Sequence, residues 1–111
     1  MQRVLLSALG RVPGVTVVGA ASGEAEAVAL ILRAQPDLVL LDLFLSPGHG
    51  FKVLKDIRGA GLACKVLVMS NELIHEEYRR RGIELGVFAF HDKGAGLGPL
   101  LDDIERLARE A

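Results

Sequence analysis

The hydrophobic positions of this chain form short unbroken runs that alternate with longer segments of helical periodicity. Runs of four apolar residues without polar alternation are typical of strands buried on both faces of a parallel sheet. Such runs, rich in valine, leucine and phenylalanine, predict strands at 15–18, 38–41, 66–69 and 87–90. Between and after them, apolar spacing of three and four residues predicts helices at 24–34, 51–58, 72–85 and 97–108.

The first twelve residues fit two interpretations. Val4, Leu5 and Leu9 lie on one helical face, whereas the apolar stretch within 3–6 is also compatible with a strand. We favour the helix, because Pro13 and the glycine after it would end a helix ahead of the strand predicted at 15–18.

Strands that alternate with single helices predict an α/β fold. Crossovers of this kind are right-handed and place helices on both faces of a parallel sheet, which gives a sandwich of three layers. The length of 111 residues suits one domain over 1–111.

Composition narrows the function classes. The 13 Lys and Arg residues are balanced by 14 Asp and Glu residues, so we expect no nucleic-acid partner. Charged residues interrupt every apolar run before it reaches the roughly 20 residues that cross a membrane, so we expect no membrane contact. The single Cys64 forms no internal disulfide, and the amino terminus does not resemble a secretory signal. These features indicate a cytoplasmic protein.

Three polar residues end three of the predicted strands. Asp42, Ser70 and Lys93 each follow an apolar run, and in an open parallel sheet functional groups gather at the carboxyl ends of the strands. Taken singly, the acid and the serine suit turn or helix caps, and the lysine suits solvent. Together, an acid, a hydroxyl and an ammonium at one edge predict a site that handles an anion.

At these residues the chain resembles the receiver domains of bacterial two-component response regulators, a family that includes the chemotaxis regulator. The resemblance covers nearly the whole chain, in motifs at 36–45, 66–70 and 86–93. It implies a flavodoxin-like fold. It also implies that Asp42 is the phosphoacceptor, that Ser70 and Lys93 bind the phosphoryl group, and that Phe90 is the aromatic switch residue. The backbone carbonyl of Phe44 would join Asp42 in binding Mg²⁺.

The function implied by this resemblance is that of a switch rather than an enzyme. A sensor histidine kinase or a phosphotransfer protein would donate the phosphoryl group to Asp42, and a changed surface would then bind a downstream protein. Two alternatives stay open: a degenerate receiver that acts as a phosphorylation-independent interaction module, and a small α/β enzyme with a phosphate site. No glycine-rich loop with phosphate-binding spacing supports the enzyme.

The sequence departs from the family at its first strand. Receivers begin with a strand that ends in two acidic residues, whereas no Asp or Glu precedes Glu24 here. The acidic pair that holds most of the Mg²⁺ is therefore absent, and Asp42 alone would bind the ion weakly. The first strand is missing or displaced, which leaves a gap between the strands predicted at 15–18 and 38–41. These strands could pair directly, a second chain could supply a strand in a homodimer, or residues ahead of Met1 could do so.

Overall fold

A parallel sheet of three strands organises the described part of the molecule. The computed structural model describes residues 2–42, 50–70 and 76–110. Its strands are β1 (Leu38–Asp42), β2 (Lys65–Ser70) and β3 (Val87–Asp92), hydrogen-bonded in the order β1-β2-β3. Both pairings are parallel, so the strands predicted at 38–41, 66–69 and 87–90 are confirmed.

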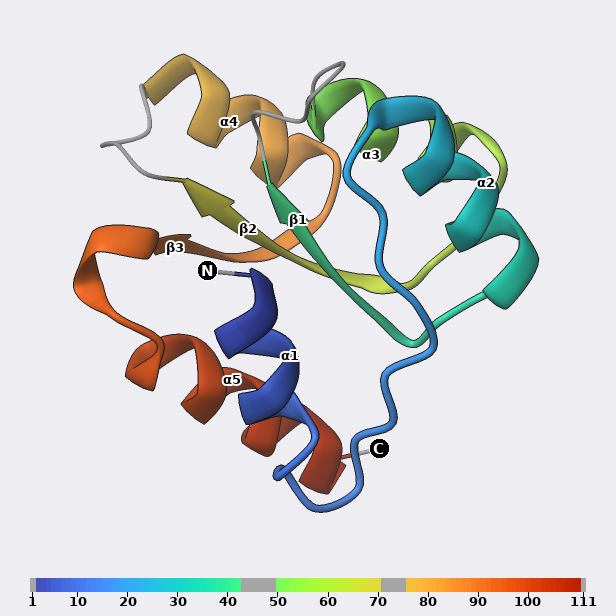
Figure 1. Cartoon of the computed structure of the whole chain (residues 1–111). Helices are drawn as coiled ribbons and strands as arrows, with labels where there is room; N and C mark the ends of the chain where they lie inside the picture. The colour runs from blue at the N-terminus through green and yellow to red at the C-terminus, as the bar shows by residue number, and fades with distance from the viewer. Residues whose placement is uncertain (1, 43–49, 71–75, 111) are drawn as a thin grey trace.

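Helices cover both faces of this sheet (Figure 1). Helices α1 and α5 lie on one face, and α2, α3 and α4 lie on the other. The predicted α/β sandwich of three layers is therefore confirmed. The bounds are α1 (Gln2–Leu9), α2 (Glu24–Ala34), α3 (Gly50–Gly59), α4 (Glu76–Glu84), the short 3₁₀ helix η1 (Lys93–Ala95) and α5 (Gly98–Glu110).

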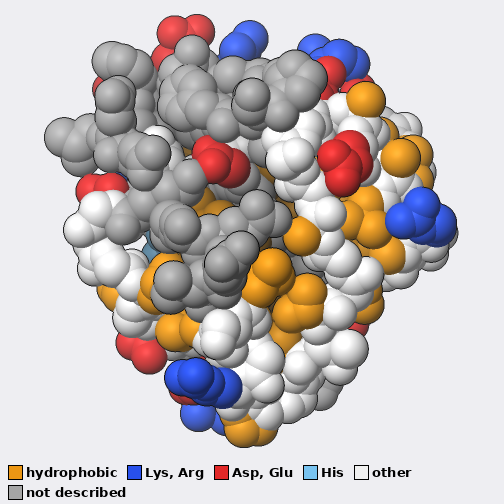
Figure 2. Space-filling view, viewed as in Figure 1, with side chains coloured by type: hydrophobic (Ala, Val, Ile, Leu, Met, Phe, Trp, Pro, Cys, Tyr) orange, Lys and Arg blue, Asp and Glu red, His pale blue; other side chains and the backbone are white. Residues whose placement is uncertain are grey.

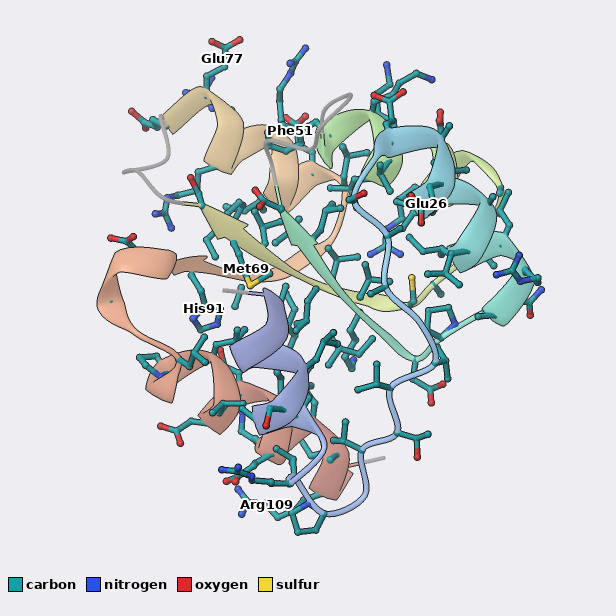
Figure 3. All side chains as sticks on the ribbon, in the orientation of Figure 1. Glu26, Phe51, Met69, Glu77, His91 and Arg109 are labelled. Carbon is teal, nitrogen blue, oxygen red and sulfur yellow. The ribbon has the colours of Figure 1, made fainter. Side chains whose placement is uncertain are left out.

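Each face of the sheet carries its own hydrophobic core. On one face the side chains of β1 and β2 pack against α2 and α3, where Val53, Leu54 and Ile57 are fully buried. On the other face Leu67 and Met69 pack against α1 and α5. Figure 3 shows Met69 and His91 on the side of α1 and α5, and Phe51 on the opposite side. The central strand β2 is thus covered from both sides.

The strand predicted at 15–18 is wrong. These residues belong to no strand or helix, and Val17 and Val18 are 42% and 59% exposed. Within the described residues β1 pairs only with β2, so residues 15–18 have no strand beside them to complete a ladder. An apolar, β-branched run becomes a strand only where a partner strand offers its backbone groups.

Two helix predictions have different outcomes. The favoured helix at the amino end is confirmed as α1, and the alternative strand at 3–6 is wrong. The helix predicted at 72–85 is observed as α4 from Glu76, while 72–75 lie outside the described residues. None of the helices in the described ranges has the length and apolar character to cross a membrane.

Arg58 joins the end of α3 to the connection between α4 and β3. Its guanidinium donates hydrogen bonds to the carbonyls of Leu85 at 2.8 Å, Leu62 at 2.9 Å and Gly86 at 3.4 Å. Gly86 adopts a φ of 80°, a backbone conformation that favours glycine, and thereby turns the chain from α4 into β3. One side chain thus satisfies carbonyl groups from two loops.

We predict that Arg58→Met lowers the free energy of unfolding by about 1–3 kcal/mol, because carbonyls of partly buried loops lose a charged donor. Urea denaturation of the purified chain measures the change. Arg109→Met on the exposed end of α5 is the matched control and should change stability by less than about 0.5 kcal/mol. Equal losses in the two variants would contradict a structural role for Arg58.

Candidate functional site

The carboxyl ends of the three strands bring the predicted polar residues to one edge of the sheet. Asp42 is the last residue of β1 and its Cα is paired in register with that of Met69. Ser70 ends β2 and is paired with Asp92, the last residue of β3. Lys93 follows directly as the first residue of η1. The structure therefore places Asp42, Ser70 and the backbone of Lys93 at neighbouring strand ends.

Asp42 and Ser70 differ in their exposure to solvent. Asp42 is partly exposed, so its carboxylate can meet a reactant from solvent. Ser70 is only 2% exposed, and it is the one buried polar side chain among the described residues. The Ser70 hydroxyl is a group that can donate and accept hydrogen bonds, at the end of the strand next to the one that Asp42 ends.

Phe90 lies on β3, two strands from the acid on β1, and faces α4. It is paired in register with Val68 and packs at the margin of the core formed with α2 and α3. The guanidinium of Arg79 lies 5.1 Å from the centroid of its ring, within cation–π range. A Cβ atom built on Gly82 would lie 2.5 Å from the ring edge. The glycine therefore creates the space in α4 that the ring occupies.

Two parts of the predicted site fall outside the described residues. These are Phe44, whose carbonyl was expected to bind Mg²⁺, and the side chain of Lys93. Glu24 opens α2 at the same edge as Asp42. In the ranges the structure describes, no three His, Cys, Asp or Glu side chains form a group that could hold a metal ion. Of the two predicted Mg²⁺ ligands, Asp42 and the carbonyl of Phe44, only Asp42 lies among the described residues.

The first turn of α3 adds charges near this edge. The ammonium of Lys52 donates a hydrogen bond to Asp56 at 2.8 Å. This bond, together with the charges of Asp56 and Glu24, raises the pKa of Lys52. Helices α2 and α3 contact each other, and Glu24 and Lys52 lie in their first turns. A cation and an acid therefore sit at adjacent helix starts.

Sequence reasoning missed the contacts around Phe90 and a cluster between β3 and α5. His91 Nε2 lies 2.8 Å from Asp103 Oδ2, and Arg106 donates to the other oxygen of Asp103 at 2.9 Å. A pair separated by twelve residues leaves no local pattern. Gly82, in contrast, is a signal that the sequence does contain, because a glycine inside a helical segment often marks a close approach of another group.

We predict that Gly82→Ala destabilises the chain relative to Gly59→Ala. The methyl group at 82 displaces the Phe90 ring, at a cost of about 1–3 kcal/mol that exceeds the gain in helix propensity. At Gly59 the added methyl meets nothing within 4 Å, so stability should rise by about 0.4–1 kcal/mol. Urea denaturation and the NMR shifts of the Phe90 ring check both effects. Equal stability and unchanged ring shifts in the 82 variant would show that the glycine makes no room for the ring.

Comparison with known proteins identifies the family. The family model described as response regulator receiver domain matches residues 1–105. The transcriptional regulatory protein YvfU of Bacillus subtilis is 27% identical over 112 residues, which cover 97% of this chain and 56% of that protein. The DNA-binding transcriptional activator DevR/DosR of Mycobacterium tuberculosis is 38% identical over 69 residues, covering 60% of this chain and 32% of the activator. The chain thus spans about half or less of the length of these relatives.

Solved structures share the fold at lower identity. The signal receiver domain of NarL from Mycobacterium tuberculosis superposes with a TM-score of 0.84 at 24% identity, covering 99% of this chain and 88% of that one. The response regulator domain of Thermotoga maritima CheB gives a TM-score of 0.82 at 24% identity, covering 100% and 89%. Together with the strand-end residues and the family match, these findings show that the chain belongs to the receiver domain family of two-component response regulators.

Proposed function

We propose that Asp42 accepts a phosphoryl group and that the chain acts as a phosphorylation switch in the cytoplasm. The observation that carries this proposal is the position of Asp42 at the carboxyl edge of the sheet, next to the strand that Ser70 ends and two strands from the start of η1. Membership of the receiver family supports phosphoryl transfer to an aspartate as the reaction. Its phosphoryl donor would be a sensor histidine kinase or a phosphotransfer protein.

The transfer itself places a carboxylate against a phosphoryl group. One oxygen of Asp42 forms a bond to phosphorus while the bond between phosphorus and the donor's histidine nitrogen breaks. The electron pair of that bond stays on the nitrogen, and the product is an acyl phosphate on Asp42. Because both reactants are anionic, positioning and neighbouring donors carry most of the catalysis.

Ser70 and Lys93 take the roles of phosphoryl ligands in this proposal. The buried Ser70 hydroxyl donates a hydrogen bond to one phosphoryl oxygen, and the ammonium of Lys93 offsets the negative charge of another. Phosphorylation adds a group with about −1.5 to −2 charges and three acceptor oxygens. Its attraction for Ser70 moves the end of β2, next to the strand that carries Phe90.

Phe90 would transmit this change to the surface of α4 and β3. Its ring occupies the space above Gly82 and lies under the guanidinium of Arg79. A turn of the ring breaks the contact with Arg79 and remodels the face that α4 and β3 form. Binding of a downstream protein to that face then depends on the phosphoryl group. The chain would thus signal through protein contacts, without turnover of a substrate.

Mg²⁺ binding is the weakest part of the family's chemistry in this chain. Mg²⁺ requires near-octahedral oxygen coordination, commonly with more than one carboxylate or phosphate ligand. The described residues offer Asp42 but no group of three acidic or histidine side chains. The described residues do not form a Mg²⁺ site by themselves. The proposed phosphoryl transfer is therefore assigned to the side chains of Asp42, Ser70 and Lys93 alone.

We predict that incubation with acetyl phosphate and Mg²⁺ adds the mass of one phosphoryl group to the chain, and that Asp42→Asn abolishes the addition. An amide lacks the anionic oxygen that attacks phosphorus. Intact mass spectrometry measures the product, and hydroxylamine should remove it because acyl phosphates are labile to that nucleophile. Asp37→Asn, at the opposite end of β1, is the matched control and should be labelled like the parent chain.

An unchanged mass for the parent chain would contradict the proposal and leave the degenerate receiver, an interaction module independent of phosphorylation, as the function. Labelling of Asp42→Asn at the parent's level would place the phosphoryl group on another residue.

Ser70→Ala should slow labelling by acetyl phosphate about 10- to 100-fold, the effect of one lost hydrogen bond to a charged group. The alanine removes the donor from the buried end of β2 and keeps the strand apolar. Ser7→Ala on the exposed side of α1 is the control and should leave the rate unchanged. The rate is followed by intact mass at increasing times. Equal rates in both variants would exclude Ser70 as a phosphoryl ligand.

A further inference from the structure

A histidine and an aspartate join strand β3 to helix α5. His91 Nε2 lies 2.8 Å from Asp103 Oδ2, and the two side chains are only 14% and 21% exposed. Figure 3 shows His91 between β3 and α5, and little of the pale blue histidine surface is visible on the face drawn in Figure 2. Because solvent screens a partly buried pair less than an exposed one, this contact can hold the strand and the helix together.

The direction of this hydrogen bond follows from the chemistry of Asp103. Its other oxygen, Oδ1, accepts a hydrogen bond from Arg106 at 2.9 Å, so the carboxylate is held from two sides. An ionised carboxylate can only accept hydrogen bonds, and Nε2 of His91 must therefore carry the hydrogen. The guanidinium of Arg106 also lies 5.7 Å from the ring centroid of Phe88 on β3. Two residues of β3 are thus linked to one turn of α5.

The described side chains around His91 supply little other charge. Its partner in register on β2 is Met69, and the described residues that α1 contributes to the adjoining core are Leu5 and Leu9. The other charged residues of α5 are exposed, namely Asp102, Glu105, Arg109 and Glu110. Among the described side chains of these elements, Asp103 with its bound guanidinium is therefore the charged group that faces His91.

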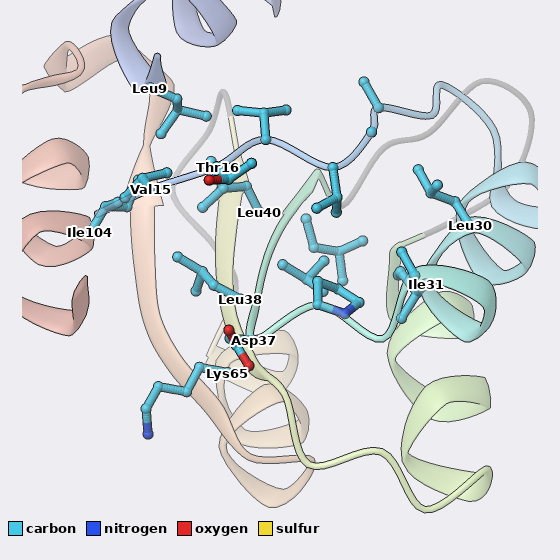
Figure 4. A pocket seen from close by; sticks show the side chains of 18 of the residues that line it. Leu9, Val15, Thr16, Leu30, Ile31, Asp37, Leu38, Leu40, Lys65 and Ile104 are labelled. Atoms are coloured by element: carbon cyan, nitrogen blue, oxygen red, sulfur yellow. The ribbon is translucent and has the colours of Figure 1, made fainter. Parts of the chain in front are cut away.

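Helix α5 is a firm anchor for this pair. Leu100 and Ile104 are only 2% and 1% exposed and belong to the core shared with β2 and α1. Figure 4 shows Ile104 near Val15, which packs against the same core. Because Ile104 directly follows Asp103, the carboxylate extends from a part of α5 that packing fixes in place.

The pair lies at the end of β3, where other contacts also hold the chain. One residue earlier, Phe90 lies under the guanidinium of Arg79 on the side of α4. One residue later, Asp92 Oδ1 accepts a hydrogen bond from the amide of Gly94 at 2.8 Å, which shapes the turn into η1. The end of β3 is therefore held by α4, by α5 and by its own turn, directly ahead of Lys93, the first residue of η1.

We infer that His91 and Asp103 are positioning residues of the phosphoryl site. Their hydrogen bond ties the end of β3 to α5 and thereby sets the backbone position from which Lys93 extends. The inference rests on the proposed function, in which Lys93 is a phosphoryl ligand, but the tie itself belongs to the unphosphorylated chain. Histidine changes its charge between about pH 5 and 8. A protonated ring adds a positive charge opposite the Asp103 carboxylate, so the tie is tighter at the acidic end of this range.

Two substitutions of His91 separate this tie from simple packing. His91→Gln keeps a side-chain N–H group that can donate to Asp103 but cannot be protonated, whereas His91→Leu keeps bulk and loses the donor. Asp103→Asn removes the charge of the partner, and Asp102→Asn, the same change at the exposed neighbouring residue, is the matched control. Hydrogen exchange followed by NMR gives the protection of amides within 90–94 from about pH 5.5 to 8, with no phosphoryl donor present.

We expect the parent chain to be about two- to fivefold better protected within 90–94 at pH 5.5 than at pH 8, the effect of one added charge. His91→Leu and Asp103→Asn should lower the protection at pH 5.5 about tenfold, the effect of a lost hydrogen bond to a charged group. His91→Gln should keep the protection that the parent has at pH 8 and lose its dependence on pH. Asp102→Asn should behave like the parent.

Labelling by acetyl phosphate tests the link to the phosphoryl site. His91→Leu should be labelled about 3- to 10-fold more slowly than the parent, because Lys93 is less well placed, and His91→Gln should restore the rate to within about twofold.

Equal protection in the parent and the leucine variant would overturn the inference, and so would losses of the same size in the glutamine variant or in Asp102→Asn. Altered protection with an unchanged labelling rate would overturn it too, since Lys93 would then not depend on the pair. The exchange measurements do not involve phosphorylation of Asp42. A parent chain that takes up no phosphoryl group would contradict the proposed function, while the exchange measurements would still decide whether the pair ties β3 to α5.

Discussion

The burial of β2 between two layers of helices is the constraint on which the other features depend. Val66 and Val68 point into the core shared with α2 and α3, whereas Leu67 and Met69 point into the core shared with α1 and α5. Because successive side chains alternate between the faces, a shift in register by one residue would exchange the two sets. The same register holds Ser70 at the edge beside Asp42. The packing of one strand therefore sets the position of the site.

The strands that could be predicted from the sequence are those whose partners lie within the described chain. The runs at 38–41, 66–69 and 87–90 form neighbouring strands of one sheet, so the prediction from their apolar character is confirmed. The run at 15–18 is also rich in valine, but within the described residues no strand pairs with it. Composition records the tendency of a segment to be extended and apolar, while pairing depends on what lies next to it.

The candidate site was predictable in position more than in detail. A polar residue that ends an apolar run marks the carboxyl end of a strand, and the structure has Asp42 and Ser70 at the ends of β1 and β2, with Lys93 directly after β3. The space above Gly82 and the contact of Arg79 with Phe90 depend on how α4 lies against β3, and only the structure shows it. The pair of His91 and Asp103 could not be predicted from the sequence either, because it joins strand β3 to helix α5 across twelve residues.

The hydrogen bonds of Arg58 have a mechanical consequence for α4. They attach the carbonyls of Leu85 and Gly86, just beyond the carboxyl end of this helix, to α3. A helix anchored at one end pivots there, so any displacement of α4 grows along its axis toward Glu76. Under the proposed switch, the surface that is displaced most would then be the Glu76 end of the helix.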